Sequence, residues 1–219
     1  MKKQSYILNL ISQGENQQLD FKFGISDSKK IARTLSAFSN TDGGRLLIGV
    51  KDNGSIAGVR SDEEFYMVEA ASQMYCRPSI LFESKSHKIN EKTVLEIFIP
   101  KNDIPPVLAP GKGNKWTAYI RVNDENIIAN KVLLKYWDKK KKNNGIYIEL
   151  SNAENLLLKY LEQNKSISLS QFIRMAQITY NRAEHILAEF MLMDIIKMEI
   201  INDETNYLLI KPKTNPTYE

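Results

Sequence analysis

The sequence predicts an α+β protein in which a larger domain of helices and strands precedes a smaller, mostly helical domain. The first 122 residues combine helical periodicity with short β-rich runs. Residues 151–211 instead contain three amphipathic helical segments and then a hairpin pattern. A chain of 219 residues is long enough for two such domains. We place them at residues 1–142 and 143–219, with a lysine-rich stretch at the boundary.

The stretch at residues 34–59, TLSAFSNTDGGRLLIGVKDNGSIAGV, is predicted to organise the larger domain. Ile31, Leu35 and Phe38 recur at helical spacing until two glycines, which stop a helix and turn the backbone. Paired glycines also permit positive φ and the close approach of another backbone or a ligand. We therefore expect an ordered loop at the start of the next strand, formed by Asn40, Thr41, Gly43 and Gly44.

That next strand is predicted at residues 46–50, where LLIGV is a continuous apolar run typical of a buried strand. The sequence DNG at residues 52–54 is a strong hairpin signal and predicts a second short strand at residues 55–59. Helix, glycine turn and hairpin are thus expected to form one unit.

The remaining elements of the first domain are predicted from the same two periodicities. Helices are expected at residues 6–14, 27–40, 62–75 and 127–142, and strands at residues 19–22, 80–86, 93–99 and 116–122. A stiff, proline-rich loop at residues 105–113 precedes the last strand. Its Gly-x-Gly is not a phosphate loop, because it precedes a strand rather than a helix.

The composition is that of a globular protein, with 42% hydrophobic and 26% charged residues. A single cysteine, Cys76, excludes an intrachain disulfide and a cysteine-rich zinc site, and two histidines make a histidine-based zinc site improbable. No run approaches the ~18 apolar residues of a transmembrane helix, and the N-terminus lacks the features of a signal peptide. We expect a cytoplasmic protein.

Positive charge is concentrated in the first domain. Residues 1–150 carry 23 Lys and Arg against 17 Asp and Glu, whereas residues 151–219 carry 7 against 9. Within the first domain, Lys29, Lys30 and Arg33 occupy the polar side of the helix at residues 27–40. This side is either a solvated basic face or a surface that contacts phosphates, and the pattern alone leaves both open.

Three motifs occur in order along the first domain: Asp20-Phe21-Lys22, Ala-Phe-x-Asn-Thr-x-Gly-Gly and Ile-Gly-Val-x-Asp-x-Gly. Together they resemble the Schlafen AlbA-like domain, once also described as a divergent ATP-binding domain of bacterial putative transcriptional regulators. The resemblance covers roughly residues 12–137 and implies a mixed-sheet AlbA-like fold and a homodimer. ATP binding has only the older description behind it, because no Walker-type loop is present.

The resemblance also implies sites for an anionic partner. Residues 118–123, AYIRVN, resemble the family's Tyr-x-Arg-x-Gly element, with Asn123 in place of the usual glycine. Arg121 is the best single candidate for binding an anion, because a guanidinium matches phosphate bidentately. The motif lysine, Lys22, and the loop at residues 40–44 are further candidates for contact with nucleic acid.

In eukaryotic Schlafen proteins this domain includes nucleases that act on structured RNA. By resemblance, the acidic positions correspond to Glu15, Asp20 and Asp52, which together could hold Mg²⁺ or Mn²⁺. An odd spacing of five means that Glu15 and Asp20 converge only if the chain bends between them. Asp20 is shorter than the usual glutamate. The alternatives are a loop cap for Glu15, a paired strand residue for Asp20 and a turn position for Asp52.

The second domain is predicted to contain helices at residues 151–163, 168–176 and 181–193, followed by a hairpin of strands at 198–201 and 207–210. This order resembles the winged helix-turn-helix of bacterial regulators. The third helix carries Arg182 and His185 as candidate nucleic-acid contacts, but also Glu184 and Glu189. Such a domain either reads DNA or mediates protein contacts.

The sequence thus predicts an AlbA-like mixed-sheet domain followed by a small winged helix. The preferred function is a nucleic-acid-binding protein, a bacterial transcriptional regulator that binds DNA or RNA as a homodimer without a cofactor. The alternative is a Schlafen-type ribonuclease that depends on Mg²⁺ or Mn²⁺ held by the three carboxylates.

Overall fold

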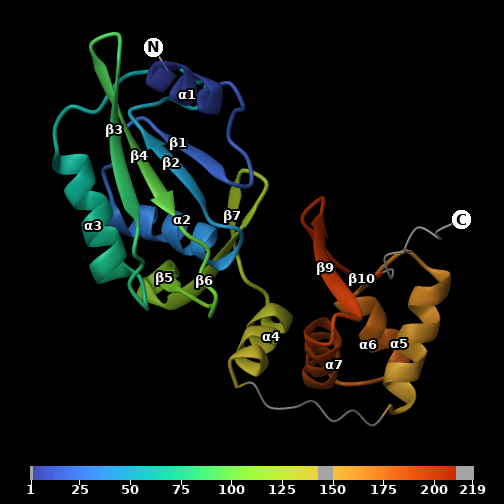
Figure 1. Cartoon of the computed structure of the whole chain (residues 1–219). Helices are drawn as coiled ribbons and strands as arrows, with labels where there is room; N and C mark the ends of the chain where they lie inside the picture. The colour runs from blue at the N-terminus through green and yellow to red at the C-terminus, as the bar shows by residue number, and fades with distance from the viewer. Residues whose placement is uncertain (1, 143–149, 211–219) are drawn as a thin grey trace, which may run out of the picture. The chain divides into compact units, whose positions relative to one another are not determined.

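A computed structural model describes residues 2–142 and 150–210, with side chains from Tyr6 onward (Figure 1). The chain divides into two compact units between Ala129 and Asn130. Among the described residues, no helix is both long enough and apolar enough to cross a membrane. The cytoplasmic location stays a prediction.

The first unit contains a four-stranded mixed sheet, so the predicted mixed-sheet α+β class is confirmed. Its elements are α1 (Lys2–Ile11), β1 (Leu19–Lys22), α2 (Ser28–Asn40), β2 (Gly44–Ile48), α3 (Glu63–Tyr75), β3 (Glu83–Ile89) and β4 (Lys92–Ile99). The strand order is β1-β2-β4-β3, in which β1 and β2 are parallel and the other pairs are antiparallel. Helix α2 makes the crossover that a parallel pair requires.

Helices cover both faces of this sheet (Figure 1). Because side chains alternate along a strand, Leu46 and Ile48 of β2 pack with α2 and α3, whereas Leu47 points to the opposite face. On that opposite face, Ile7 of α1 and Phe21 of β1 pack with Leu47. Two hydrophobic layers therefore enclose the strands.

A second, three-stranded sheet follows in the first unit. Its strands are β5 (Leu108–Pro110), β6 (Trp116–Val122) and β7 (Glu125–Ile128), in the order β5-β6-β7. The 3-10 turn η1 (Lys112–Asn114) connects β5 to β6. The predicted helix at residues 127–142 begins later, as α4 (Lys131–Lys142), because Ile127 and Ile128 pair with β6. Sequence periodicity missed β7 because its four residues are too short to show an alternation.

The hairpin at residues 52–54 is present, but the predicted strand at residues 55–59 is wrong. The Lys51 amide donates to the Ser55 carbonyl (3.0 Å), and only an isolated bridge joins Val50 to Ile56. The amides of Ala57 and Gly58 then both donate to the Gly49 carbonyl, which bends the chain instead of extending the ladder.

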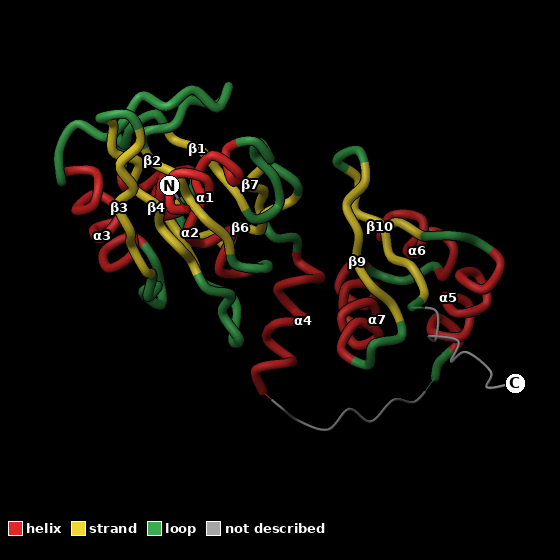
Figure 2. Tube along the Cα trace, turned by 45° about the horizontal axis from the view of Figure 1, so that its top comes forward, coloured by secondary structure: helices red, strands yellow, loops and turns green. Residues whose placement is uncertain are grey.

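The second unit contains α4, α5 (Asn152–Gln163), β8 (Ile167–Ser168), α6 (Leu169–Ala176), α7 (Tyr180–Leu192), β9 (Ile196–Ile201) and β10 (Glu204–Leu209). Strand β10 lies between β8 and β9 in a three-stranded sheet. Figure 2 shows β9 and β10 side by side. The helices after residue 150 and the final hairpin agree with the order expected from the sequence, and β8 is an additional short strand.

Helix α4 belongs to the second unit, whereas the predicted boundary after residue 142 assigned it to the first domain. Val132 of α4 is buried in the same hydrophobic cluster as Leu157 of α5 and Leu187 of α7. This burial is the physical reason why the boundary lies before α4 and not after it.

The turn from α2 into β2 depends on a glycine. Gly43 has φ of +70°, and a Cβ there would lie 2.8 Å from the Ile99 carbonyl oxygen and 2.9 Å from the Lys101 amide nitrogen. The predicted ordered loop is thus a point where two backbones meet too closely for any side chain.

We predict that Gly43→Ala lowers the free energy of unfolding by more than about 2 kcal/mol, since it adds left-handed strain and backbone overlap. Urea unfolding measures the change. Gly24→Ala is the matched control, because a Cβ at Gly24 meets nothing within 4 Å. Equal effects of the two substitutions would contradict this account of the turn.

Candidate nucleic-acid interface and buried polar network

Glu15 and Asp20 lie close together because the chain bends between them, which is the condition that their odd spacing set. A bridge between Asn16 and Leu19 closes a turn, and the Glu15 Oε1 then accepts a hydrogen bond from the Phe21 amide (2.8 Å). Burial raises the pKa of Glu15 above its ordinary value; the Phe21 amide opposes this rise and the neighbouring Asp20 carboxyl adds to it. Glu15 is therefore both a loop cap and the partner of a second carboxyl.

Asp20 is buried between two cations. Its Oδ1 lies 3.2 Å from Nη2 of Arg121, and its Oδ2 lies 2.8 Å from Nζ of Lys22. The Lys22 ammonium also donates a hydrogen bond to the Phe21 carbonyl (2.8 Å), and its contact with Oδ2 is an ion pair without hydrogen-bond geometry. Lys22 is thus paired inside the protein.

Arg121 is not available to an anion in this structure, because only 2% of the residue is exposed. Besides Asp20, its guanidinium donates to the carbonyls of Asn16 (3.3 Å) and Leu19 (3.2 Å) and to the Asn126 side chain (3.0 Å). These contacts use all three nitrogens. The proposed anion-binding arginine is instead a structural one.

Asn40 and Thr41 of the glycine loop also serve the fold. The Asn40 amide donates to the carbonyls of Val107 (2.8 Å) and Tyr119 (2.9 Å), and its oxygen accepts from the Val107 amide (2.7 Å). The Thr41 hydroxyl accepts from the Arg121 amide (2.9 Å). With Gly43 and Gly44 buried beside them, these residues join the two sheets rather than facing a ligand.

Asp52 lies exposed in the hairpin turn, as its alternative interpretation stated. Among the described residues, no group of three or more His, Cys, Asp or Glu side chains is arranged to hold a metal ion. Because Asp20 is already paired with Arg121 and Lys22, the carboxylates do not fit the divalent-ion site that the nuclease alternative requires. No catalytic step follows from them.

Basic side chains instead gather where α2 begins, around η1 and β5. The Lys29 ammonium donates to the Asn114 side chain (3.1 Å), and Arg33 donates to the Pro110 carbonyl (2.8 Å). Pro110 pairs with Trp116, and the Arg77 guanidinium lies over the Trp116 ring at 3.9 Å from its centroid. We call the surface formed by these cations the basic rim; its members are Lys29, Arg33, Arg77, Lys112 and Lys115.

The basic rim is a cluster of neighbouring cations that have no acidic partner in the part of the chain that the structure describes. None of its five cations forms an ion pair within the described residues, and Lys30, which follows Lys29 on α2, is likewise exposed and unpaired there. Tyr75 adds a second aromatic ring, 5.8 Å from the Lys29 ammonium. Unpaired cations beside aromatic faces suit a phosphate backbone with accessible bases.

The sequence pattern predicted only the α2 part of this surface. Arg77, Lys112, Lys115 and Trp116 were missed because they come from two other segments, beyond α3 and around η1. The available signal was a pair of lysines flanking a glycine-containing turn, at residues 111–115.

The contacts predicted on α7 are occupied within the second unit. Arg182 forms an ion pair with the buried Glu154 of α5, in which Nη2 lies 2.6 Å from Oε1. His185 is half-buried, and burial together with Lys135 and Lys139 lowers its pKa, which favours a neutral imidazole. Arg182 is therefore held by α5, although 49% of its side chain is exposed.

Helix α4 covers the face of α7 opposite the core. Ile186 and Leu187 point into the hydrophobic core, whereas Glu184 faces α4, where Lys135 lies 3.6 Å away. One turn further on, Lys139 pairs with Glu189 at 2.9 Å. The face of α7 that carries Glu184 and Glu189 can enter a DNA groove only if these contacts with α4 are lost.

A comparison with protein families identifies the first unit. The family model of Schlafen, AlbA_2 matches residues 15–130, more than half of the chain. The chain is similar to the DIP2311 protein from Corynebacterium diphtheriae, with 15% identity and a TM-score of 0.47, over 83% of this chain and 35% of that one. It thus spans about a third of that protein's length.

A second similar structure is the N-terminal domain of a putative ATP-dependent DNA helicase RecG-related protein from Nitrosomonas europaea. The identity is 18% and the TM-score is 0.39, over 58% of this chain and 93% of that chain. No curated protein matches the chain.

We predict that Arg121→Met lowers the free energy of unfolding by about 3–5 kcal/mol, because it leaves the buried Asp20 without its main partner. Chemical denaturation measures the loss. Arg77→Met is the control, since that exposed arginine has no buried carboxylate. A small, equal loss for both variants would show that the buried network does not stabilise the first unit.

Proposed function

Since the chain belongs to the Schlafen AlbA_2 family, we propose that it is a nucleic-acid-binding protein whose first unit contacts the phosphate backbone through the basic rim. The observation that carries this proposal is the set of five neighbouring cations without acidic partners among the described residues. Cations that are not neutralised internally release counterions when they meet phosphates, which drives association.

Arg77 is the member of the basic rim whose guanidinium is best positioned to bind a phosphate. Its guanidinium is held over Trp116, and the peptide groups of Arg77 and Leu108 exchange hydrogen bonds of 2.9 and 2.7 Å. An arginine whose position is fixed in this way loses less conformational entropy on binding. Lys112 and Lys115 extend the same positive surface along the loop at η1.

The finer proposal is a transcriptional regulator with a C-terminal winged helix. It is supported by the order of α5, β8, α6, α7, β9 and β10 and by the pairing of β10 between the other two strands. Because α4 covers α7, we assign backbone contact to the first unit and not to Arg182 or His185. The homodimer and the choice between DNA and RNA stay predictions.

We predict that Arg77→Ala, Lys112→Ala and Lys115→Ala each weaken binding of a labelled oligonucleotide by roughly threefold to tenfold, and each reduces the salt dependence by about one phosphate contact. Fluorescence anisotropy at two salt concentrations, with DNA and RNA in single- and double-stranded form, measures both quantities. The effect should be similar across sequences.

The control is Lys101→Ala, which removes an exposed lysine that is paired with Asp42 at 3.5 Å. It should leave affinity and salt dependence nearly unchanged. If Lys101→Ala weakened binding as much as the variants of the basic rim, the rim would have no special role. Cleavage of the oligonucleotide in Mn²⁺ that is lost in Asp20→Asn would support the nuclease alternative instead.

A further inference from the structure

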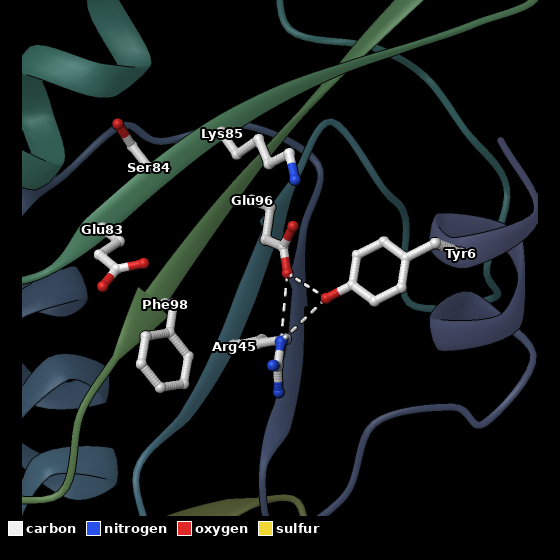
Figure 3. Close-up of a pocket in the computed structure, with 7 residues that line it drawn as sticks. All are labelled: Tyr6, Arg45, Glu83, Ser84, Lys85, Glu96 and Phe98. Atoms are coloured by element: carbon white, nitrogen blue, oxygen red, sulfur yellow. Dashed lines mark hydrogen bonds and ion pairs between the residues drawn. The ribbon is translucent and has the colours of Figure 1, made fainter. Parts of the chain in front are cut away.

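A pocket of about 310 Å³ lies on the face of the four-stranded sheet that α1 partly covers (Figure 3). This is the face opposite α2, so the pocket is separate from the basic rim. Its volume is near the lower end of the range of about 300–1,000 Å³ for small-molecule sites. The residues that line it are Tyr6, Arg45, Glu83, Ser84, Lys85, Glu96 and Phe98.

Strand register brings the charged side chains of the pocket together. Phe98 of β4 is paired with Arg45 of β2 on one side and with Glu83 of β3 on the other. Glu96, two residues before Phe98, is paired with Lys85. Since residues two apart share a face, Lys85 and Glu83 reach the same side of the sheet as Arg45.

Glu96 is buried, with 6% of the residue exposed, and both of its oxygens are occupied. Oε1 accepts hydrogen bonds from the Tyr6 hydroxyl (2.7 Å) and from Arg45 Nε (3.1 Å), while Oε2 lies 2.7 Å from Nε2 of the buried His87. Burial and the Glu96 carboxylate raise the pKa of Tyr6, which keeps the phenol protonated as a donor. Glu96 is therefore a positioning residue.

Arg45 is the group that Glu96 positions. Its Nε donates to Glu96 and to the Tyr6 oxygen (3.1 Å), and its guanidinium lies over the Phe98 ring at 5.1 Å (Figure 3). Its two terminal nitrogens have no hydrogen-bond partner in the part of the chain that the structure describes, and 38% of the side chain is exposed. A guanidinium held on three sides with its outer donors free suits the oxygens of a phosphate.

We propose that this pocket binds the phosphate group of a phosphate ester that carries a neighbouring hydroxyl group. Arg45 and Lys85 contact the phosphate, and the exposed Glu83 accepts a hydrogen bond from the hydroxyl. The Glu83 carboxylate, at the edge of the pocket, would repel an anion that has no hydrogen-bond donor. The proposed ligand therefore includes a hydroxyl group, which can donate a hydrogen bond to Glu83. Two sources supply this chemistry: the sugar-phosphate of a nucleic acid, or a free sugar phosphate.

The test is a titration of the full-length protein with ribose 5-phosphate and with inorganic phosphate, followed by calorimetry. Ribose 5-phosphate should bind saturably and more tightly than inorganic phosphate. Lys85→Ala, which leaves the Glu96 network intact, should weaken binding about tenfold, and Arg45→Gln should abolish it in protein that still melts cooperatively. Glu83→Gln should reduce the preference for the sugar phosphate.

The matched control is Lys88→Ala, on the same strand but the opposite face, where Lys88 pairs with Glu91 at 3.1 Å. Absence of saturable binding, or equal weakening by Lys88→Ala and Lys85→Ala, would overturn the proposal. A short RNA that displaces ribose 5-phosphate assigns the occupant to nucleic acid, whereas simultaneous binding of both assigns it to the free ester. Arg77→Ala, which tests the basic rim, should leave these results unchanged.

Discussion

The buried ion pair between Arg121 and Asp20 is the contact on which the first unit depends. Arg121 comes from β6 of the small sheet, and Asp20 comes from β1 of the main sheet, so their 3.2 Å contact joins the two sheets. The backbone amide of Arg121 extends this link to Thr41, at the end of α2. Burying such a pair is costly unless the remaining donors are satisfied, and here they are, by carbonyls and by Asn126.

Internal ion pairs such as this one determine which basic side chains remain available to bind an anionic partner. The strand cations Arg121 and Lys22 are used internally, and Lys135 and Lys139 of α4 are paired with glutamates of α7. The basic rim stays available, because Lys29, Arg33 and Arg77 are held by amide, carbonyl and aromatic groups, which leave their positive charge uncompensated. Structural and binding roles are thus divided between two sets of basic residues.

Local patterns predicted the helix, glycine turn and strand around residues 31–48, since Gly43 and the apolar spacing act over a few residues. Side-chain roles were harder to predict. Arg121 has the same appearance in sequence whether it points inward or outward, and its partner Asp20 lies 101 residues away. The lysines of α4 fitted the helix dipole, while their glutamate partners on α7 depend on tertiary packing. The basic rim joins three distant segments, so no single local pattern in the sequence reveals it as one surface.

The most direct test of the account is ultraviolet crosslinking of the full-length protein to a single-stranded oligonucleotide, with the crosslinked peptides identified by mass spectrometry. The account predicts crosslinks in peptides that contain Tyr75 or Trp116, next to the basic rim. Crosslinks confined to α7, around Tyr180 and His185, would contradict the account, because they would show that the second unit, not the first, contacts nucleic acid.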